Sequence, residues 1–228
     1  MTLKEIIDTV LRQSGVSTET AYASSSNDSV LRLVDLANQS VAMIARHPWQ
    51  ALRRIYTFTL STDTQYDLPA DFRSLASDTM YSDTDQEGLD FPASEEKWSY
   101  LKASSSGSSG TQVRIIADKI NVHEPDSGST VRFEYNSKYP ITDSTGAFKE
   151  RFTADTDSTV LQDDLVISEL LWRYKKLVGL SDWQVDLAES KDLMQTLKGL
   201  DGGSKTVGPH EEGFVTPYYD LWRPVPNS

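Results

Sequence analysis

Residues 41–60, VAMIARHPWQALRRIYTFTL, contain the change of hydrophobic period that decides the fold. Before it, apolar residues recur at helical spacing as far as Ala45, and Pro48 cannot continue a helix because it lacks an amide hydrogen. After it, large apolar residues alternate with threonine from Tyr56 to Leu60, which is typical of a half-buried strand. The sequence therefore predicts that a helical region ends here and a β region begins.

Helical periodicity occurs on both sides of the β region. Thr2 and Glu5 have the spacing of a capping box at the start of the chain. The stretch from Asp163 to Gly179 is apolar on nearly all sides, which favours a central position in a bundle. A further apolar stripe leads to Gly199. We predict four helices, at residues 2–13, 27–46, 163–179 and 181–199.

The middle of the chain has the alternation and the turn residues of antiparallel strands. We expect the first two strands to form a hairpin that ends in a turn at Pro69, and residues 117–119 resemble a tight hairpin connection. A small antiparallel sandwich or barrel is the expected result. The predicted strands are residues 54–60, 65–68, 73–81, 112–117, 119–124 and 130–135.

These elements predict an α+β protein with three parts. The two chain ends, residues 1–50 and 155–200, are expected to form one discontinuous α-helical bundle, because their apolar stripes are most economically buried on each other. Residues 51–154 are expected to form an inserted antiparallel β-sandwich or barrel-like domain. Residues 201–228 are expected to form an extended C-terminal arm.

The arm is rich in large apolar rings for a segment that follows a Gly-rich spacer. Disordered segments usually lack such rings, and the three prolines between residues 217 and 226 exclude a helix. We predict that the arm fills a groove in another subunit; the alternative is that it folds back over its own domain. The residues expected to make the contact are Phe214, Tyr218, Tyr219, Leu221, Trp222 and Arg223.

Composition argues against several classes of protein. The 228 residues include no cysteine and three histidines, which excludes thiolate zinc sites, thiol nucleophiles and disulfides. The formal net charge of −12 argues against a nucleic-acid binder, since such binding needs lysine and arginine to neutralise phosphates. Acidic residues near the N-terminus and the lack of a long apolar run predict a soluble protein with no signal peptide and no membrane partner.

Candidate catalytic and metal sites are weak. The adjacent pair Asp163-Asp164 is explained by compensation of a helix dipole. Residues 155–159 begin like a calcium loop, but the turn glycine and the closing glutamate of such a loop are missing. His123-Glu124 has no second histidine within ligand spacing. We therefore predict no catalytic residue, no metal site and no cofactor.

Three stretches carry a family resemblance. They are RHPWQAL at residues 46–52; the strand and turn pattern YTFTL and QYDLPADF at residues 56–60 and 65–72; and DSTVL with the helix LVISELLWRYKKLVGL at residues 157–161 and 165–180. Together they resemble the head–tail adaptor, or connector, proteins of tailed bacteriophages, particularly those of short-tailed phages. The resemblance covers most of residues 25–200.

The resemblance implies a structural virion protein without enzymatic activity. It implies a homo-oligomeric ring of twelve copies that binds the portal protein, extends the DNA channel and presents a platform for tail tube, nozzle or tail spike proteins. DNA would only pass through the ring, without sequence-specific binding, which suits the acidic charge. The protein would assemble in the host cytoplasm and reside at the portal vertex of the virion, with the arm contacting the portal.

Two alternatives come from other functional classes. One is a virion-associated carbohydrate-binding or adhesion module, in which exposed Trp98, Tyr100 and Tyr81 would stack on sugars. Trp98 falls in a segment predicted as a loop, although it could equally cover the β core. The other is a glycan hydrolase that uses acidic residues around the β region.

Overall fold

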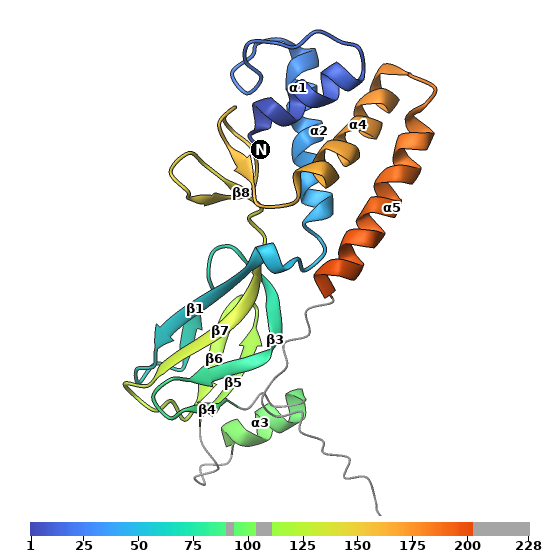
Figure 1. Ribbon diagram of the computed structural model, residues 1–228. Coiled ribbons are helices and arrows are strands. Elements are labelled where there is room, and N and C mark those ends of the chain that lie inside the picture. Colours follow the sequence, from blue (N-terminus) through green and yellow to red (C-terminus); the bar gives the residue numbers. More distant parts are fainter. Residues whose placement is uncertain (90–93, 104–110, 203–228) are drawn as a thin grey trace, which may run out of the picture.

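The computed structural model describes residues 1–89, 94–103 and 111–202, which form a helical body and a β sandwich at opposite ends of the molecule (Figure 1). The predicted α+β class is therefore confirmed. The predicted helices are also confirmed, and the last one continues three residues beyond Gly199. The helical body contains α1 (Leu3–Gln13), α2 (Asp28–Ile44), α4 (Asp163–Val178) and α5 (Trp183–Gly202).

The helical body is organised around α4. This helix contacts α1, α2 and α5, as its apolar sequence predicts, whereas α5 packs chiefly on α4. At the other side of the bundle α1 begins with the predicted capping box, in which Thr2 and Glu5 exchange hydrogen bonds of 3.3 and 2.8 Å. The buried core includes Leu3, Ile6, Ile7, Val10, Val34, Ala37, Val41, Leu165, Val166 and Leu170.

Gly179 ends α4 in the left-handed conformation, with φ of 80°. A Cβ atom there would touch no neighbouring atom, so Gly179→Ala should cost only the backbone strain, about 1–2 kcal/mol of unfolding free energy. Gly199→Ala is the matched control, because Gly199 lies inside α5 with equally open surroundings and should gain about 0.5–1 kcal/mol. Urea denaturation of both variants tests this. Equal stability of the two would contradict the assignment of Gly179 as a conformational stop.

A small three-stranded sheet, not predicted from the sequence, packs beside the helical body. Its strand order is β10 (Ser158–Thr159), β8 (Ile141–Thr142) and β9 (Phe148–Lys149), and all pairs are antiparallel. Ile141 and Phe152 from this region are buried in the same core as the helices. The helical body therefore also includes the segment between β7 and α4, by which the chain returns from the β sandwich.

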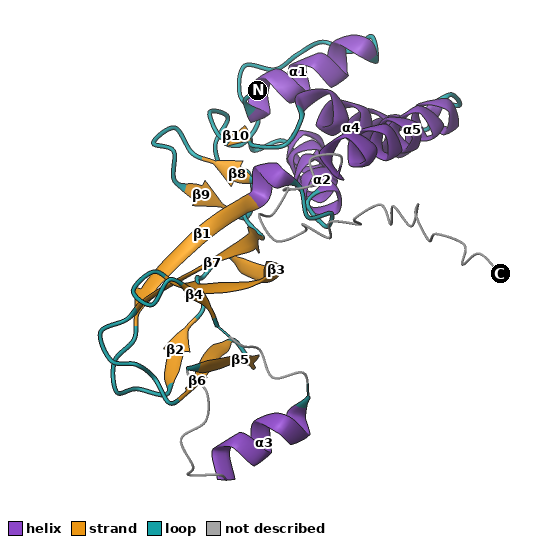
Figure 2. Ribbon diagram, turned by 60° about the horizontal axis from the view of Figure 1, so that its bottom comes forward, coloured by secondary structure: helices purple, strands orange, loops and turns teal. Residues whose placement is uncertain are grey.

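The β sandwich consists of two antiparallel sheets, and the described strands form no closed barrel (Figure 2). One sheet has the order β1 (Arg53–Thr59), β7 (Thr130–Ser137), β3 (Phe72–Ser82) and β4 (Glu87–Gly88); the other has the order β2 (Gln65–Asp67), β6 (Lys119–His123) and β5 (Gln112–Ile116). Both contribute to one core around Phe133, which includes Leu60, Met80, Val113, Ile120, Val122, Val131 and Tyr135.

The two predicted hairpins had different outcomes. The tight connection between β5 and β6 is confirmed: Ile116 pairs with Lys119, and Ala117 and Asp118 have positive φ values of 46° and 61°. The hairpin between the first two strands is wrong, because β1 pairs with β7 and β2 pairs with β6. The chain after β1 crosses to the other sheet instead of returning along the same one.

Two short connections join the helical body to the β sandwich. The chain leaves through the 3₁₀ turn Gln50–Leu52 and returns after β7. At the return, the Asp71 carboxylate accepts hydrogen bonds from Tyr135 Oη at 2.8 Å and from Ser137 Oγ at 2.6 Å. Burial and then this carboxylate raise the pKa of Tyr135. Arg73 donates to the Ala45 carbonyl near the end of α2, so the QYDLPADF stretch ties the sandwich to the bundle.

Candidate assembly surfaces

Glu169 holds α4 and α5 together at the centre of their contact. Its carboxylate accepts hydrogen bonds from Trp172 Nε1 at 3.0 Å, from Arg173 at 2.7 and 3.1 Å, and from Ser190 Oγ of α5 at 2.9 Å. The Glu169 and Arg173 side chains are only 15% and 17% exposed. Four donors converge on one half-buried carboxylate, which fixes the position of α5 on α4.

Glu169→Gln should lower the unfolding free energy by about 1.5–3 kcal/mol, because it keeps the shape of the side chain but removes the charge that faces Arg173. Ser190→Ala deletes one neutral donor from the same cluster and should cost about 0.5–1.5 kcal/mol. Denaturant titration of both variants measures the difference. A Gln variant as stable as the wild type would show that the cluster does not hold the two helices.

The turn between α4 and α5 is tied by Lys175. Its amine lies 2.7 Å from an Asp182 oxygen and 2.9 Å from an Asp186 oxygen, and the side chain is 11% exposed. The hydrogen bonds with Asp182 and Asp186 raise the pKa of Lys175. Trp172 and Trp183 are half-buried, and their ring centroids lie 6.5 Å apart across the hairpin. The α4–α5 hairpin is thus a rigid element with partly exposed rings.

An open groove of about 310 Å³ lies between the α1–α2 link, the start of α2 and the end of α4. We call it the end groove. Most of its walls are apolar, with polar residues such as Glu19 and Arg32 also lining it. Tyr22 lies in the wall with its hydroxyl donating to Asp8 and accepting the Glu19 amide hydrogen at 3.0 Å. Burial, followed by the bond to Asp8, raises the pKa of Tyr22 to about 12.

The end of α5 is fixed where the described chain ends. The Asp201 carboxylate accepts the Gln50 amide hydrogen at 3.1 and 3.3 Å, and Gln50 Nε2 donates to the Asp201 carbonyl at 2.8 Å. Gly202 therefore lies at the junction of the helical body and the β sandwich. The predicted contact residues of the arm all lie outside the described residues; they are Phe214, Tyr218, Tyr219, Leu221, Trp222 and Arg223.

The aromatic residues suggested for sugar stacking do not form one exposed surface. Trp98 lies in α3 (Glu95–Ala103), a helix where a loop was predicted, and is 4% exposed with its ring 6.3 Å from that of His123 on β6. Trp98 therefore covers the sandwich, and its predicted role as an exposed ring is wrong. Tyr100 is 72% exposed on the same helix, whereas Tyr81 lies on β3 beneath Arg132.

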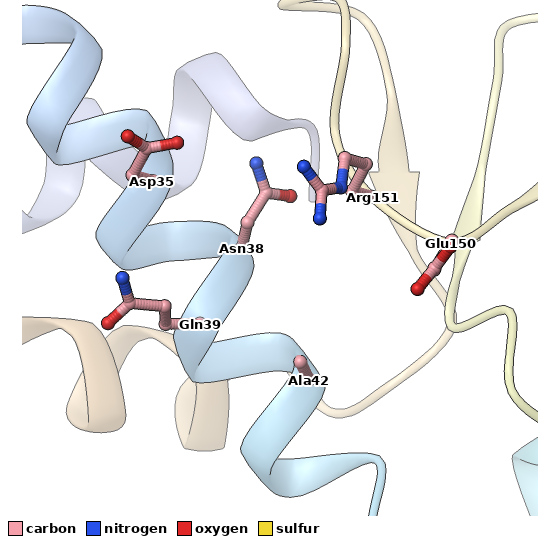
Figure 3. A pocket seen from close by; sticks show the side chains of 6 residues that line it. All are labelled: Asp35, Asn38, Gln39, Ala42, Glu150 and Arg151. Carbon is pink, nitrogen blue, oxygen red and sulfur yellow. The ribbon is translucent and has the colours of Figure 1, made fainter.

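A second open hollow, of about 380 Å³, lies between α2 and the loop after β9 (Figure 3). Its lining is polar, in contrast to the end groove. Asn38 projects from α2 toward Arg151, and its side chain also accepts the Phe152 amide hydrogen at 2.7 Å, so it anchors the loop to the helix. Acidic and basic groups are mixed around this hollow, as on a solvated surface; the lining residues are Asp35, Asn38, Gln39, Ala42, Glu150 and Arg151.

Two carboxylates of the candidate calcium loop have structural partners. The Asp155 carboxylate accepts amide hydrogens from Tyr22 and Ala23, and that of Asp157 is buried against Lys149. Within residues 1–89, 94–103 and 111–202, no group of three or more His, Asp or Glu side chains is placed to hold a metal ion. No helix in these ranges is long and apolar enough to cross a membrane.

The comparisons with known proteins identify the family. The family model described as SU10 adaptor protein matches residues 1–210, which is all but the last 18 residues of the chain. The search of curated proteins finds no match. The head–tail adaptor resemblance is thereby confirmed, while its short-tailed type stays a prediction. The chain belongs to the SU10 adaptor protein family and is a bacteriophage adaptor protein, a structural component of the virion.

Proposed function

We propose that this adaptor protein assembles into a ring of twelve copies that binds the portal protein and connects it to the tail. The supporting observation is the architecture, in which the helical body and the β sandwich lie at opposite ends of the described chain and are joined at a tied junction (Figures 1 and 2). A ring subunit between two assemblies needs separate surfaces for its neighbour, for the portal and for the tail. Two distinct bodies provide such surfaces.

The acidic charge of the chain supports a channel role. A formal net charge of −12 gives a surface that repels phosphate on average, so DNA would pass through the ring without being retained. The tail-side partners would be tail tube, nozzle or tail spike proteins. Assembly would occur in the host cytoplasm before the ring becomes part of the virion at the portal vertex.

The C-terminal arm is the proposed portal contact. It continues from Gly202, whose position is set by the hydrogen bonds between Asp201 and Gln50. Aromatic rings such as Tyr218 and Trp222 are frequent binding hot spots because they bury large apolar areas at low entropic cost. Twelve arms on one ring would act together through their high effective concentration, so each contact can be modest.

Native mass spectrometry and negative-stain imaging of the protein, with and without the portal ring from the same genome, test the proposal. A monomer that converts into a portal-bound ring of twelve copies is the expected result. A protein that stays monomeric and unbound when the portal ring is present would reject both the adaptor ring and its portal contact. A ring that forms but ignores the portal would reject the portal contact alone.

A further inference from the structure

The end groove has a buried apolar floor. Leu11, Tyr22 and Leu33 are between 0% and 4% exposed, and they come from α1, the α1–α2 link and α2. The Tyr22 hydroxyl is satisfied by Asp8 and by the Glu19 amide, so Tyr22 is held in the core beneath the groove. These three residues belong to the core of the helical body and give the groove a fixed, pre-formed shape.

The rim of the same groove exposes large aliphatic side chains. Val16 is 41% exposed, and Leu177 and Val178 at the end of α4 are each 49% exposed. Leu180, two residues further on, is 39% exposed. Contiguous apolar patches of this kind are uncommon on monomeric proteins unless they bind something. The end groove is thus a docking surface that has no occupant among the described residues.

We infer that, in the free protein, the aromatic arm of the same chain occupies the end groove and covers it until the portal competes for the arm. Residues 214–226, FVTPYYDLWRPVP, supply the apolar side chains that such a groove would bind. The chain outside the described residues begins at Gly203 and includes this whole segment. In this arrangement the apolar side chains of the arm and those of the end groove shield each other from water.

The arm is long enough to reach the groove. The end of α5 lies near the start of α4, because Asp201 and Leu165 line the same small hollow. Val178 lies 13 residues after Leu165 along α4, which is about 20 Å at 1.5 Å per residue. The 15 residues between Gly202 and Tyr218 can span up to about 50 Å. The tether therefore permits the contact with length to spare, even though it must also pass around the bundle.

Charge does not oppose the contact. Glu19 and Arg32 line the groove, and residues 214–226 carry one residue of each sign, Asp220 and Arg223. The arm of the same chain is favoured over that of a second copy, because a short tether gives an effective concentration in the millimolar range. The inference concerns the free protein and depends on the proposed function only in naming the portal as the competitor.

Cysteine pairs test the contact in the full-length protein without any portal, so the result is independent of the proposed function. The chain has no cysteine, which means that every crosslink comes from the introduced pair. Val178→Cys combined with Leu221→Cys should form an intrachain disulfide under mild oxidation. Its control is Ile55→Cys combined with Leu221→Cys, because Ile55 is 66% exposed on β1, only five residues from Gln50.

The groove pair is expected to crosslink at least 10-fold faster than the control pair, at a rate that does not change when the protein is diluted. Leu177→Cys provides a second groove position, and melting curves of the reduced variants verify that each is folded. Equal rates for the groove and control pairs would overturn the inference. So would a covalent dimer as the main product, which would assign the groove to the arm of a second copy.

Discussion

Removal of residues 210–228 should abolish portal binding while leaving the helical body and the β sandwich folded. The deleted segment contains all the predicted contact residues, from Phe214 to Arg223, and begins after the last described helix. Hot-spot aromatic residues each contribute about 2 kcal/mol or more, so the loss of several should weaken binding at least 100-fold. Surface plasmon resonance against immobilised portal rings measures the affinity, and urea denaturation measures the stability.

Two further variants make this result specific to the rings. Replacing Phe214, Tyr218, Tyr219 and Trp222 by serine keeps the length and charge of the arm and should reproduce the deletion. Replacing Asp220 by Asn keeps the rings and should leave binding within a few-fold of the wild type. An arm-deleted protein that binds the portal with unchanged affinity would sink the assignment of the arm as the portal contact.

The helices and most strands could be predicted because their signals are local. The stripe of α1, the cap at Thr2 and the stop at Gly179 depend on neighbours within four residues. The same holds for the hairpin turn at Ala117-Asp118. Such elements have a periodicity or a backbone requirement that can be recognised in isolation.

Strand pairing and short elements could not be predicted, since they depend on distant residues. The partner of β1 is β7, more than 70 residues away, and nothing near Leu60 reveals the crossing between sheets. The strands of the small sheet have two residues each, which is too short for alternation to show. In α3 only Trp98 and Leu101 are buried, so this helix lacks a full apolar stripe.

The end groove was missed for a related reason. Leu11 and Leu33 belong to helical stripes whose spacing indicates only a buried core. The available signal was α4, which remains apolar as far as Leu177 and Val178, beyond the part of the bundle that covers it. A helix that stays apolar past its packing partners indicates a surface for something else.

Asp157→Ala should destabilise the helical body by about 3–5 kcal/mol, because it removes a buried carboxylate that accepts hydrogen bonds from Lys149 and from two backbone amides, and it leaves those amides without their acceptor. Asp157 is 1% exposed, and one of its oxygens accepts from Lys149 Nζ at 2.7 Å and from the amide hydrogens of Thr153 and Ala154 at 2.7 and 2.8 Å. Its carbonyl also accepts the Leu3 amide hydrogen at 2.8 Å, so the same residue anchors the start of α1.

The loss should be visible as two-state unfolding at a lower urea midpoint. Asp143→Ala is the matched control, because that carboxylate also accepts two amide hydrogens, at 2.8 and 3.0 Å, but in an exposed turn. Its replacement should have a much smaller effect. If the two alanine variants unfold at the same urea concentration, burial of Asp157 is not the source of its importance.

The pH dependence of stability separates the charge of Asp157 from its shape. Burial alone would raise the pKa of this carboxyl, but the hydrogen bonds from Lys149, Thr153 and Ala154 outweigh it and the pKa is lowered. The unfolded-state pKa is about 3.9, so the charged form stabilises the fold fully above that pH and progressively less as the pH falls through the folded-state value. The stability difference between wild type and Asp157→Asn should therefore be constant from pH 5 to 7 and shrink below about pH 4. A difference that does not change with pH would mean that Asp157 acts through packing alone.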